Sequence, residues 1–200
     1  MTPRQLSREL REGDSDDLQR RRWVAGLSFV GVGIGVVVSL YQFGIIKHLP
    51  DPPVGPFDSD RVDASDYAYK RMLTPDAFMM VATYGVTAAL AGAGGETRAE
   101  THPWLPLAMA GKAAYDLATC VKLGAEEWAE NKAFCAYCQV ATLISAATAA
   151  LTLPEAWRAL KRLEQSGPPQ ARVAQALRRS SDSSPPRRRI GTSGRRWGRS

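Results

Sequence analysis

The sequence predicts an all-α membrane protein, a bundle of four transmembrane helices with both termini in the cytoplasm. Three runs without a charged side chain carry this prediction. They are 24, 19 and 20 residues long and cover residues 23–46, 77–95 and 134–153. Each can cross a hydrocarbon core of about 30 Å at about 1.5 Å per helical residue. The average composition, 44% hydrophobic and 23% charged, hides this pattern because much of the charge lies in the tails. These long uncharged runs therefore argue against a soluble domain.

The first predicted helix covers residues 23–46 and follows a polar segment, residues 1–22, that ends in three arginines. Its uncharged run is too long for the apolar part of a signal peptide, which has about 7–15 residues, and no small-x-small cleavage site follows it. We interpret this run as a retained membrane anchor. Residues 47–76 then form a loop that is rich in Pro and Asp.

The second helix covers residues 77–95 and is closed by two glycines. The third covers residues 104–122 and is less obvious, because it contains Lys112 and Asp116. These two residues are four apart and share a helical face, where they can partly neutralise each other. The rest of the segment is mostly Ala, Leu, Met and Val, which suits close packing of helices in a membrane.

The fourth helix begins near Phe134, after a short acidic connection at residues 122–133, and Pro154 is expected to end it. Residues 155–166 have the composition of a short surface helix. From residue 167 onward the Pro, Ser and Arg content indicates disorder. The chain thus divides into an N-terminal segment, a membrane domain and a basic, largely disordered cytoplasmic tail, at residues 1–22, 23–157 and 158–200.

The distribution of basic residues predicts the orientation. With both termini inside, the cytoplasmic segments hold 19 of the 26 Lys and Arg residues, which is the asymmetry that orients membrane helices. Trp23, Trp104 and Trp157 then fall near the inner interface, as an aromatic belt requires. We expect a multi-pass protein of the inner (cytoplasmic) membrane of the cell, with the lipid bilayer as its surroundings.

The C-terminal tail accounts for the net charge of +6, because residues 167–200 hold nine arginines against one acid, Asp182. The simplest interpretation is a disordered tail that helps to fix topology, with no nucleic-acid partner expected. The alternative is a tail that tethers anionic lipid or nucleic acid, as basic segments do.

Three cysteines, Cys120, Cys135 and Cys138, are too few for a disulfide scaffold, and the two histidines lie too far along the chain to complete a zinc site with them. We therefore expect no metal. The topology puts the CxxC motif, Cys135 to Cys138, at the outer end of the fourth helix, where a helix N-terminus stabilises a thiolate. The outer side is also the oxidising compartment. The alternative is a pair of small apolar residues that pack in the bundle.

A second cluster runs along the third helix, where Lys112, Asp116 and Cys120 form a stripe at a spacing of four. Ionisable residues inside a membrane are functional candidates by default. The stripe is therefore an accessory candidate, a proton relay. The alternative is a structural ion pair beside an inert thiol.

Four helices, a long outer loop and a CxxC that opens the fourth helix resemble the vitamin K epoxide reductase family over roughly residues 23–157. Residues 59–68 (SDRVDASDYA) are similar to the family's loop pattern of a cysteine, a valine three residues on, a serine three further and a Tyr-Ala pair. The stretch at residues 47–53 resembles a bacterial subgroup of the family.

This resemblance implies a membrane thiol-disulfide oxidoreductase that couples the CxxC to reduction of a quinone, ubiquinone or menaquinone, as co-substrate. It implies that Cys138 faces the quinone and forms a transient adduct with it, and that Cys135 exchanges disulfides. It implies that Ser65 helps to close the quinone pocket. The partner it implies is a thioredoxin-like or other periplasmic thiol protein.

Two departures from the family pattern shape the hypotheses. No cysteine occurs in residues 43–76, and Ser59 stands where one loop cysteine is expected, so Cys135 would exchange directly with its partner. Thr142 stands where a tyrosine that contacts the quinone is common. The leading hypothesis remains a quinone-linked thiol oxidoreductase that acts through Cys135 and Cys138, and Cys120 is a further candidate, for a substitute resolving thiol. The alternative is a non-catalytic membrane module that binds quinone or a partner.

Overall fold

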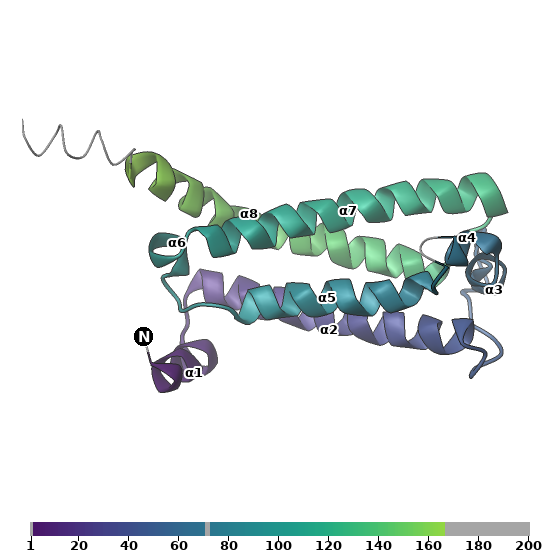
Figure 1. The fold of residues 1–200 in the computed structure, drawn as a ribbon, viewed down its shortest axis with the longest axis horizontal. Helices are drawn as coiled ribbons and strands as arrows, with labels where there is room; N and C mark the ends of the chain where they lie inside the picture. The colour runs from purple at the N-terminus through teal and green to yellow at the C-terminus, as the bar shows by residue number, and fades with distance from the viewer. Residues whose placement is uncertain (1, 71–72, 167–200) are drawn as a thin grey trace, which may run out of the picture. The chain divides into compact units, whose positions relative to one another are not determined.

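The computed structural model describes residues 2–70 and 73–166, and every regular element in them is a helix. Four long helices run alongside one another (Figure 1). They are α2 (Asp16–Gln42), α5 (Asp76–Gly92), α7 (Trp104–Asn131) and α8 (Ala136–Ser166). Short helices lie at the two ends: α1 (Pro3–Glu12) and α6 (Arg98–Thr101) at one, α3 (Ser59–Asp63) and α4 (Asp66–Tyr69) at the other. The all-α prediction is confirmed for the described residues.

Two of these helices are long and apolar enough to cross a membrane, Asp16–Gln42 and Ala136–Gln165. Helix α5 is apolar but has only 17 residues, and α7 contains the Lys112–Asp116 pair. Large apolar side chains on these helices face outward, such as Phe29 at 66% exposure and Leu143 at 69%. Exposed apolar surface of this kind is typical of a helix in lipid. The two spans agree with a helical membrane protein; the four-span topology stays a prediction.

The N-terminal segment is more ordered than its polar composition indicates. Thr2 caps α1, with its hydroxyl accepting from the Gln5 N–H at 3.3 Å and the Gln5 side chain accepting from the Thr2 N–H at 2.7 Å. Ser15 caps α2, and two aspartates in its first turn favour the positive end of the helix dipole. The first long helix therefore begins at Asp16, seven residues before the uncharged run.

Helix α7 continues to Asn131, so the prediction of a non-helical connection from residue 122 is wrong. These residues are mostly good helix formers, and Lys122 pairs with Glu126 one turn on at 3.7 Å. The helix ends where Lys132 takes a left-handed conformation, with φ at 51° and its N–H donating to the Trp128 carbonyl at 3.1 Å. The connection to α8 is thereby reduced to a tight turn.

The prediction that Pro154 ends the fourth helix is also wrong, because Pro154 lies inside α8, which continues to Ser166. A proline removes one helical hydrogen bond and bends a helix, and Figure 1 shows a change of direction in the last part of α8. The next turn is held by Glu155, whose buried carboxylate binds Arg98 at 2.7 Å. The expected surface helix is thus the end of α8, and the expected disordered tail, residues 167–200, lies outside the described residues.

Buried arginines tie the helices together at the end that carries α1 and α6. The Arg21 guanidinium donates to four carbonyls where α5 ends, at 2.8–3.0 Å. These are the carbonyl groups of Ala91, Ala93, Gly94 and Gly95. Arg158 on α8 pairs with Asp17 on α2. The start of α2 and the C-terminal part of α8 therefore lie at one end, and the CxxC lies at the other.

A close approach of α2 to α5 positions Tyr84. A Cβ built at Gly31 would lie 2.6 Å from the Tyr84 ring, closer than real contacts allow. The ring therefore lies flat against the Gly31 backbone and is directed into the bundle. Its hydroxyl donates to the Ala141 carbonyl at 2.7 Å.

Candidate active site

Cys135 and Cys138 lie at the N-terminus of α8, as the sequence predicts. The Cys135 sulfur occupies the position of a helix cap, because the Cys138 N–H points to it at 3.2 Å. Cys135 lies one residue before the apolar span, and hydrogen bonding with Cys138 lowers the pKa of its thiol against the opposing effect of burial. The helix N-terminus acts in the same direction on a thiolate. Cys135 is therefore the preferred site of negative charge in the dithiol.

The structure differs from expectation in the access to Cys135, whose exposure is 0%. Residues 49–69, the cover segment, pack over it. Val62 and Tyr67 form a buried cluster with Cys135, and the Tyr67 hydroxyl donates to the Leu123 carbonyl at 2.9 Å. The Tyr137 hydroxyl donates to a carbonyl of the same segment at 3.1 Å. Direct exchange with a partner thiol therefore requires this segment to move.

Ser59 holds the cover segment against α8. Its hydroxyl accepts from the Ala136 N–H at 3.0 Å and donates to the Asp51 carboxylate at 2.5 Å. The Asp51 side chain also accepts from the Ser59 N–H at 2.6 Å. A parallel bridge between Phe57 and Phe134 extends this contact. The side chain at the position expected for a loop cysteine thus lies beside the CxxC.

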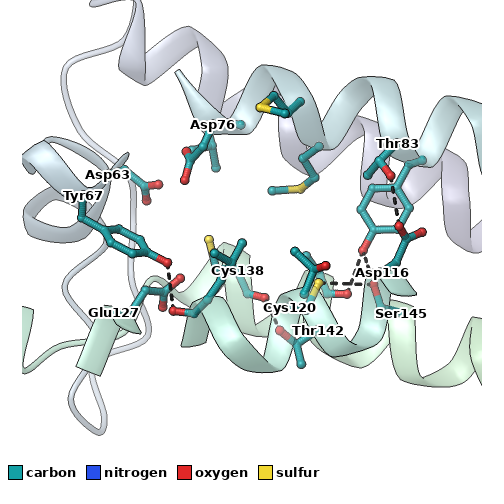
Figure 2. A pocket seen from close by; sticks show the side chains of 18 of the residues that line it. Asp63, Tyr67, Asp76, Thr83, Asp116, Cys120, Glu127, Cys138, Thr142 and Ser145 are labelled. Atoms are coloured by element: carbon teal, nitrogen blue, oxygen red, sulfur yellow. Dashed lines mark hydrogen bonds between the residues drawn. The ribbon is translucent and has the colours of Figure 1, made fainter. Parts of the chain in front are cut away.

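A cavity of about 240 Å³ opens inside the bundle, and Cys138 lines it (Figure 2). All four long helices contribute to its wall, together with Asp63 and Tyr67 of the cover segment. Most of the wall is apolar, with Met79 and Met80 on one side. Its volume lies just below the range of pockets that enclose a whole drug-sized ligand. The cavity therefore suits a ring-sized apolar group.

Three carboxyl groups surround the thiol end of the cavity: Asp63 from α3, Asp76 from α5 and Glu127 from α7 (Figure 2). Asp76 accepts from the Gln42 amide at 2.9 Å. Glu127 accepts from the Cys135 N–H at 3.4 Å and the Gln139 amide at 3.3 Å.

Asp63 differs from the other two acids, because it is 2% exposed and its Oδ2 has no hydrogen-bond partner. Burial raises the pKa of Asp63 to about 10, with further contributions from Cys135 and the neighbouring acids. Desolvation without donors favours the neutral form of an acid. Asp63 is therefore a protonated carboxylic acid at neutral pH.

Hydroxyl groups line the far end of the cavity. The Tyr84 hydroxyl lies 3.0 Å from Ser145 Oγ, and the Cys120 sulfur lies 3.6 Å from the same oxygen. Nearer the thiol end, the Thr142 hydroxyl donates to the Cys138 carbonyl at 2.9 Å and so bonds its own helix. The cavity thus has a thiol and three acids at one end, and hydroxyl groups with the Asp116 carboxylate at the other (Figure 2).

Of the three residues of the predicted stripe on α7, the structure pairs Lys112 with Asp116 but not with Cys120. Lys112 Nζ lies 2.5 Å from Asp116, and Thr83 of α5 bridges them, accepting from Lys112 at 2.9 Å and donating to Asp116 at 3.1 Å. Cys120 instead faces Ser145. Asp116 and Cys120 line the cavity, and Lys112 is not among its described lining residues. A relay along this stripe stays a prediction.

Ser65 begins α4, and its hydroxyl donates to the Val62 carbonyl at 2.6 Å. Within the described residues, the cavity wall includes Asp63 and Tyr67 on either side of it in sequence, but not Ser65. Its predicted contact with a quinone therefore stays a prediction.

Donor atoms of Asp63, Cys135 and Cys138 lie within 4.8 Å of one another. Three donors are one short of the closed four-ligand set that a structural zinc site uses. The absence of a metal stays a prediction. The cluster itself is a dithiol beside an acid.

The sequence did not lead us to Asp63, Tyr67 and Tyr84, nor to Asp76 and Glu127, the two acids at the thiol end whose oxygens accept hydrogen bonds. Two signals were available. Asp63 and Tyr67 lie inside the loop motif at residues 59–68, and Tyr84 interrupts an uncharged apolar run with a hydroxyl that needs a partner. Glu127 is brought to the thiols by the packing of α7 against the cover segment, and no local sequence pattern predicts this contact.

The fold and the site define a helical membrane protein with a buried dithiol at the mouth of an apolar cavity, the arrangement of a membrane thiol oxidoreductase. The sequence profile described as the Vitamin K epoxide reductase family matches residues 22–153, about two thirds of the chain. The chain belongs to this family, whose members are membrane-embedded thiol oxidoreductases that act with quinones and thiol partners. No curated protein and no solved structure matches it.

Proposed function

We propose that this protein is a quinone-linked thiol oxidoreductase, in which Cys135 and Cys138 pass two electrons from a dithiol donor to a membrane quinone. The observation that carries the proposal is the place of Cys138, on the wall of an apolar cavity with Cys135 directly behind it. The cavity fits the ring of a quinone, with Cys138 at one end and hydroxyl groups at the other.

The reaction divides into two half-reactions. An external dithiol reduces the Cys135–Cys138 disulfide in two exchanges. The first donor thiol attacks the Cys135 sulfur, forms a mixed disulfide with it and releases Cys138. The second donor thiol then attacks the donor sulfur of the mixed disulfide and releases Cys135, whose lowered pKa makes it a good leaving group. The Cys138 sulfur then adds to the quinone ring. Cys135 attacks the Cys138 sulfur, which re-forms the disulfide and releases the hydroquinone.

The membrane orientation is part of the proposal. Four spans with both termini in the cytoplasm are supported by the ion pair of Arg158 with Asp17, which joins the start of α2 to the C-terminal part of α8. Trp23, Trp104 and Trp157 are each more than 60% exposed and belong to helix segments near this same end. The CxxC then lies on the periplasmic side of the inner membrane, where a thioredoxin-like or other thiol protein is the donor.

The test is quinone reduction by the purified protein in detergent, with a small dithiol as donor. Turnover is expected for the natural protein and complete loss for Cys138→Ser. Cys120→Ser removes one thiol from the same cavity and is the matched comparison, for which at most a partial loss is expected. Turnover that survives Cys138→Ser would refute the proposal. Quinone binding without any turnover would favour the non-catalytic module instead.

A further inference from the structure

We propose that Asp63 is a catalytic acid of the quinone half-reaction, which delivers a proton to the departing hydroquinone and recovers one from the Cys135 thiol. This inference rests on the proposed function. It starts from three observations. Asp63 lines the cavity beside Cys138, its Oδ2 is buried without a partner, and one of its carboxyl oxygens lies within 4.8 Å of both sulfurs.

The other acids of the cavity do not suit this role. Asp76 and Glu127 accept hydrogen bonds from amide and backbone N–H groups, which occupy their oxygens and hold them in place. Asp116 lies at the far end of the cavity, where it is bound by Lys112 and Thr83 (Figure 2). Asp63 has no such donor on Oδ2, so its neutral form is favoured and a proton is available on the side of the cavity.

Asp63 also contacts the nucleophile. A carboxyl oxygen of Asp63 lies within 4.8 Å of the Cys135 sulfur, and burial together with this neighbour raises the pKa of the acid, which favours charge on sulfur and the proton on oxygen. The exposure of Cys135 is 0% and that of Asp63 is 2%, so bulk water does not compete for the proton at this point. A buried site of this kind needs a resident proton carrier, because two protons must reach the quinone with the two electrons.

The proton balance is then complete within the site. In the first step the Cys138 thiol adds to the quinone: a C–S bond forms, and the thiol proton goes to a quinone oxygen. In the second step the Cys135 sulfur attacks the Cys138 sulfur, so the S–S bond forms and the C–S bond breaks. The electron pair of the C–S bond passes through the ring to the second quinone oxygen, which takes the proton of Asp63. The Asp63 carboxylate receives the proton that leaves Cys135. The two thiols thus supply both hydrogens of the hydroquinone.

Because Asp63 acts in the second step, its loss leaves the first step intact. Asp63→Asn keeps the size and the neutral charge of the protonated acid but has no proton to deliver. We expect kcat for quinone reduction to fall by about 10²-fold, within the range for loss of a general acid. We expect the Cys138–quinone adduct to accumulate and KM for quinone to fall together with kcat, because the step after adduct formation becomes rate-limiting. Asp63→Glu, which restores an acid, is expected to recover at least tenfold over Asp63→Asn.

The experiment measures steady-state kinetics and the mass of the Cys138 peptide after rapid quenching, with ubiquinone-1 as the probe. Asp66→Asn is the matched control, because Asp66 is an exposed acid of the next helix and is expected to leave kcat unchanged. If kcat of Asp63→Asn equals that of the natural protein, the inference is overturned. A lower kcat with a raised KM and no adduct would also overturn it. If Cys138→Ser abolishes turnover while Asp63→Asn does not affect it, the proposed function stands and only the role of Asp63 fails.

Discussion

Ser59 lies in hydrogen-bonding contact with Cys135, and its hydroxyl accepts from the Ala136 N–H at 3.0 Å. The serine that stands at the position of a loop cysteine therefore occupies the place from which such a cysteine would reach the CxxC.

The first prediction follows from this contact. Ser59→Cys is expected to form a disulfide with Cys135 under mild oxidation, because the two side chains already touch and the backbone needs little movement. Mass spectrometry of the cleaved protein would detect the linked peptides. Ser65→Cys is the control, since the Ser65 hydroxyl is directed to the Val62 carbonyl, and no link to Cys135 is expected there. Equal linkage from both positions would contradict the observed arrangement.

The second prediction concerns stability and pH. The pKa of Asp63 is raised from 3.8 to about 10 in the fold, so the folded state binds the extra proton between these values. Stability from this group is therefore present below the unfolded pKa and is lost as pH rises toward 10, by up to about 1.4 kcal/mol per pH unit. The groups that face Asp63 are Cys135, Cys138, Asp76 and Glu127.

Asp63→Asn stays neutral at every pH. Its melting temperature in detergent should exceed that of the natural protein at pH 8, and the difference should shrink as the pH falls to 4. A constant difference across this range would show that Asp63 is not protonated in the fold.

The third prediction concerns access to Cys135. Tyr67→Phe removes the hydroxyl that bonds the Leu123 carbonyl and leaves the packing of the ring in place. Loss of one such bond lowers the free energy of opening by about 1 kcal/mol, which corresponds to roughly fivefold faster opening of the cover segment. The rate of maleimide labelling at Cys135 is the measurement, with Cys138 replaced by Ser. An unchanged labelling rate would mean that another contact limits opening.

The fourth prediction concerns the Lys112–Asp116 pair, whose side chains are only 18% and 10% exposed. Removing one partner leaves an unpaired buried charge, so Lys112→Met and Asp116→Leu are each expected to lower stability by about 3 kcal/mol. The double variant should lose less than either single one, because no charge remains. Thermal unfolding of the four proteins gives the double-mutant cycle. Additive losses would contradict a coupled pair.

The sequence was sufficient for the helices and the thiols, because both depend on local patterns. Charge-free runs located three of the four long helices, the remaining one was recognised despite its Lys112–Asp116 pair, and the spacing of Cys135 and Cys138 indicated the candidate site. Helix ends were less predictable. The turn that follows Pro154 is held by Glu155 through its pair with Arg98, 57 residues away in sequence, and no local pattern reports that contact.

The acids of the cavity were missed for the same reason. Asp63 has ordinary neighbours in sequence, and only the packing of the cover segment against α8 buries it beside two sulfurs. Arg21 was counted as a charge that orients the membrane helix. In the fold it also caps the end of α5 by binding four carbonyls, a role that depends on where another helix ends.

The cover segment has two surfaces with different tasks. Asp63 and Tyr67 form part of the cavity wall, and residues of the same segment seal Cys135 from outside. Opening the seal over Cys135 therefore also removes part of the cavity wall, so occupancy of the cavity and access to Cys135 are thermodynamically linked and oppose each other. For the proposed function, this linkage means that the two half-reactions alternate in time and that the reductant and the quinone do not share one open passage.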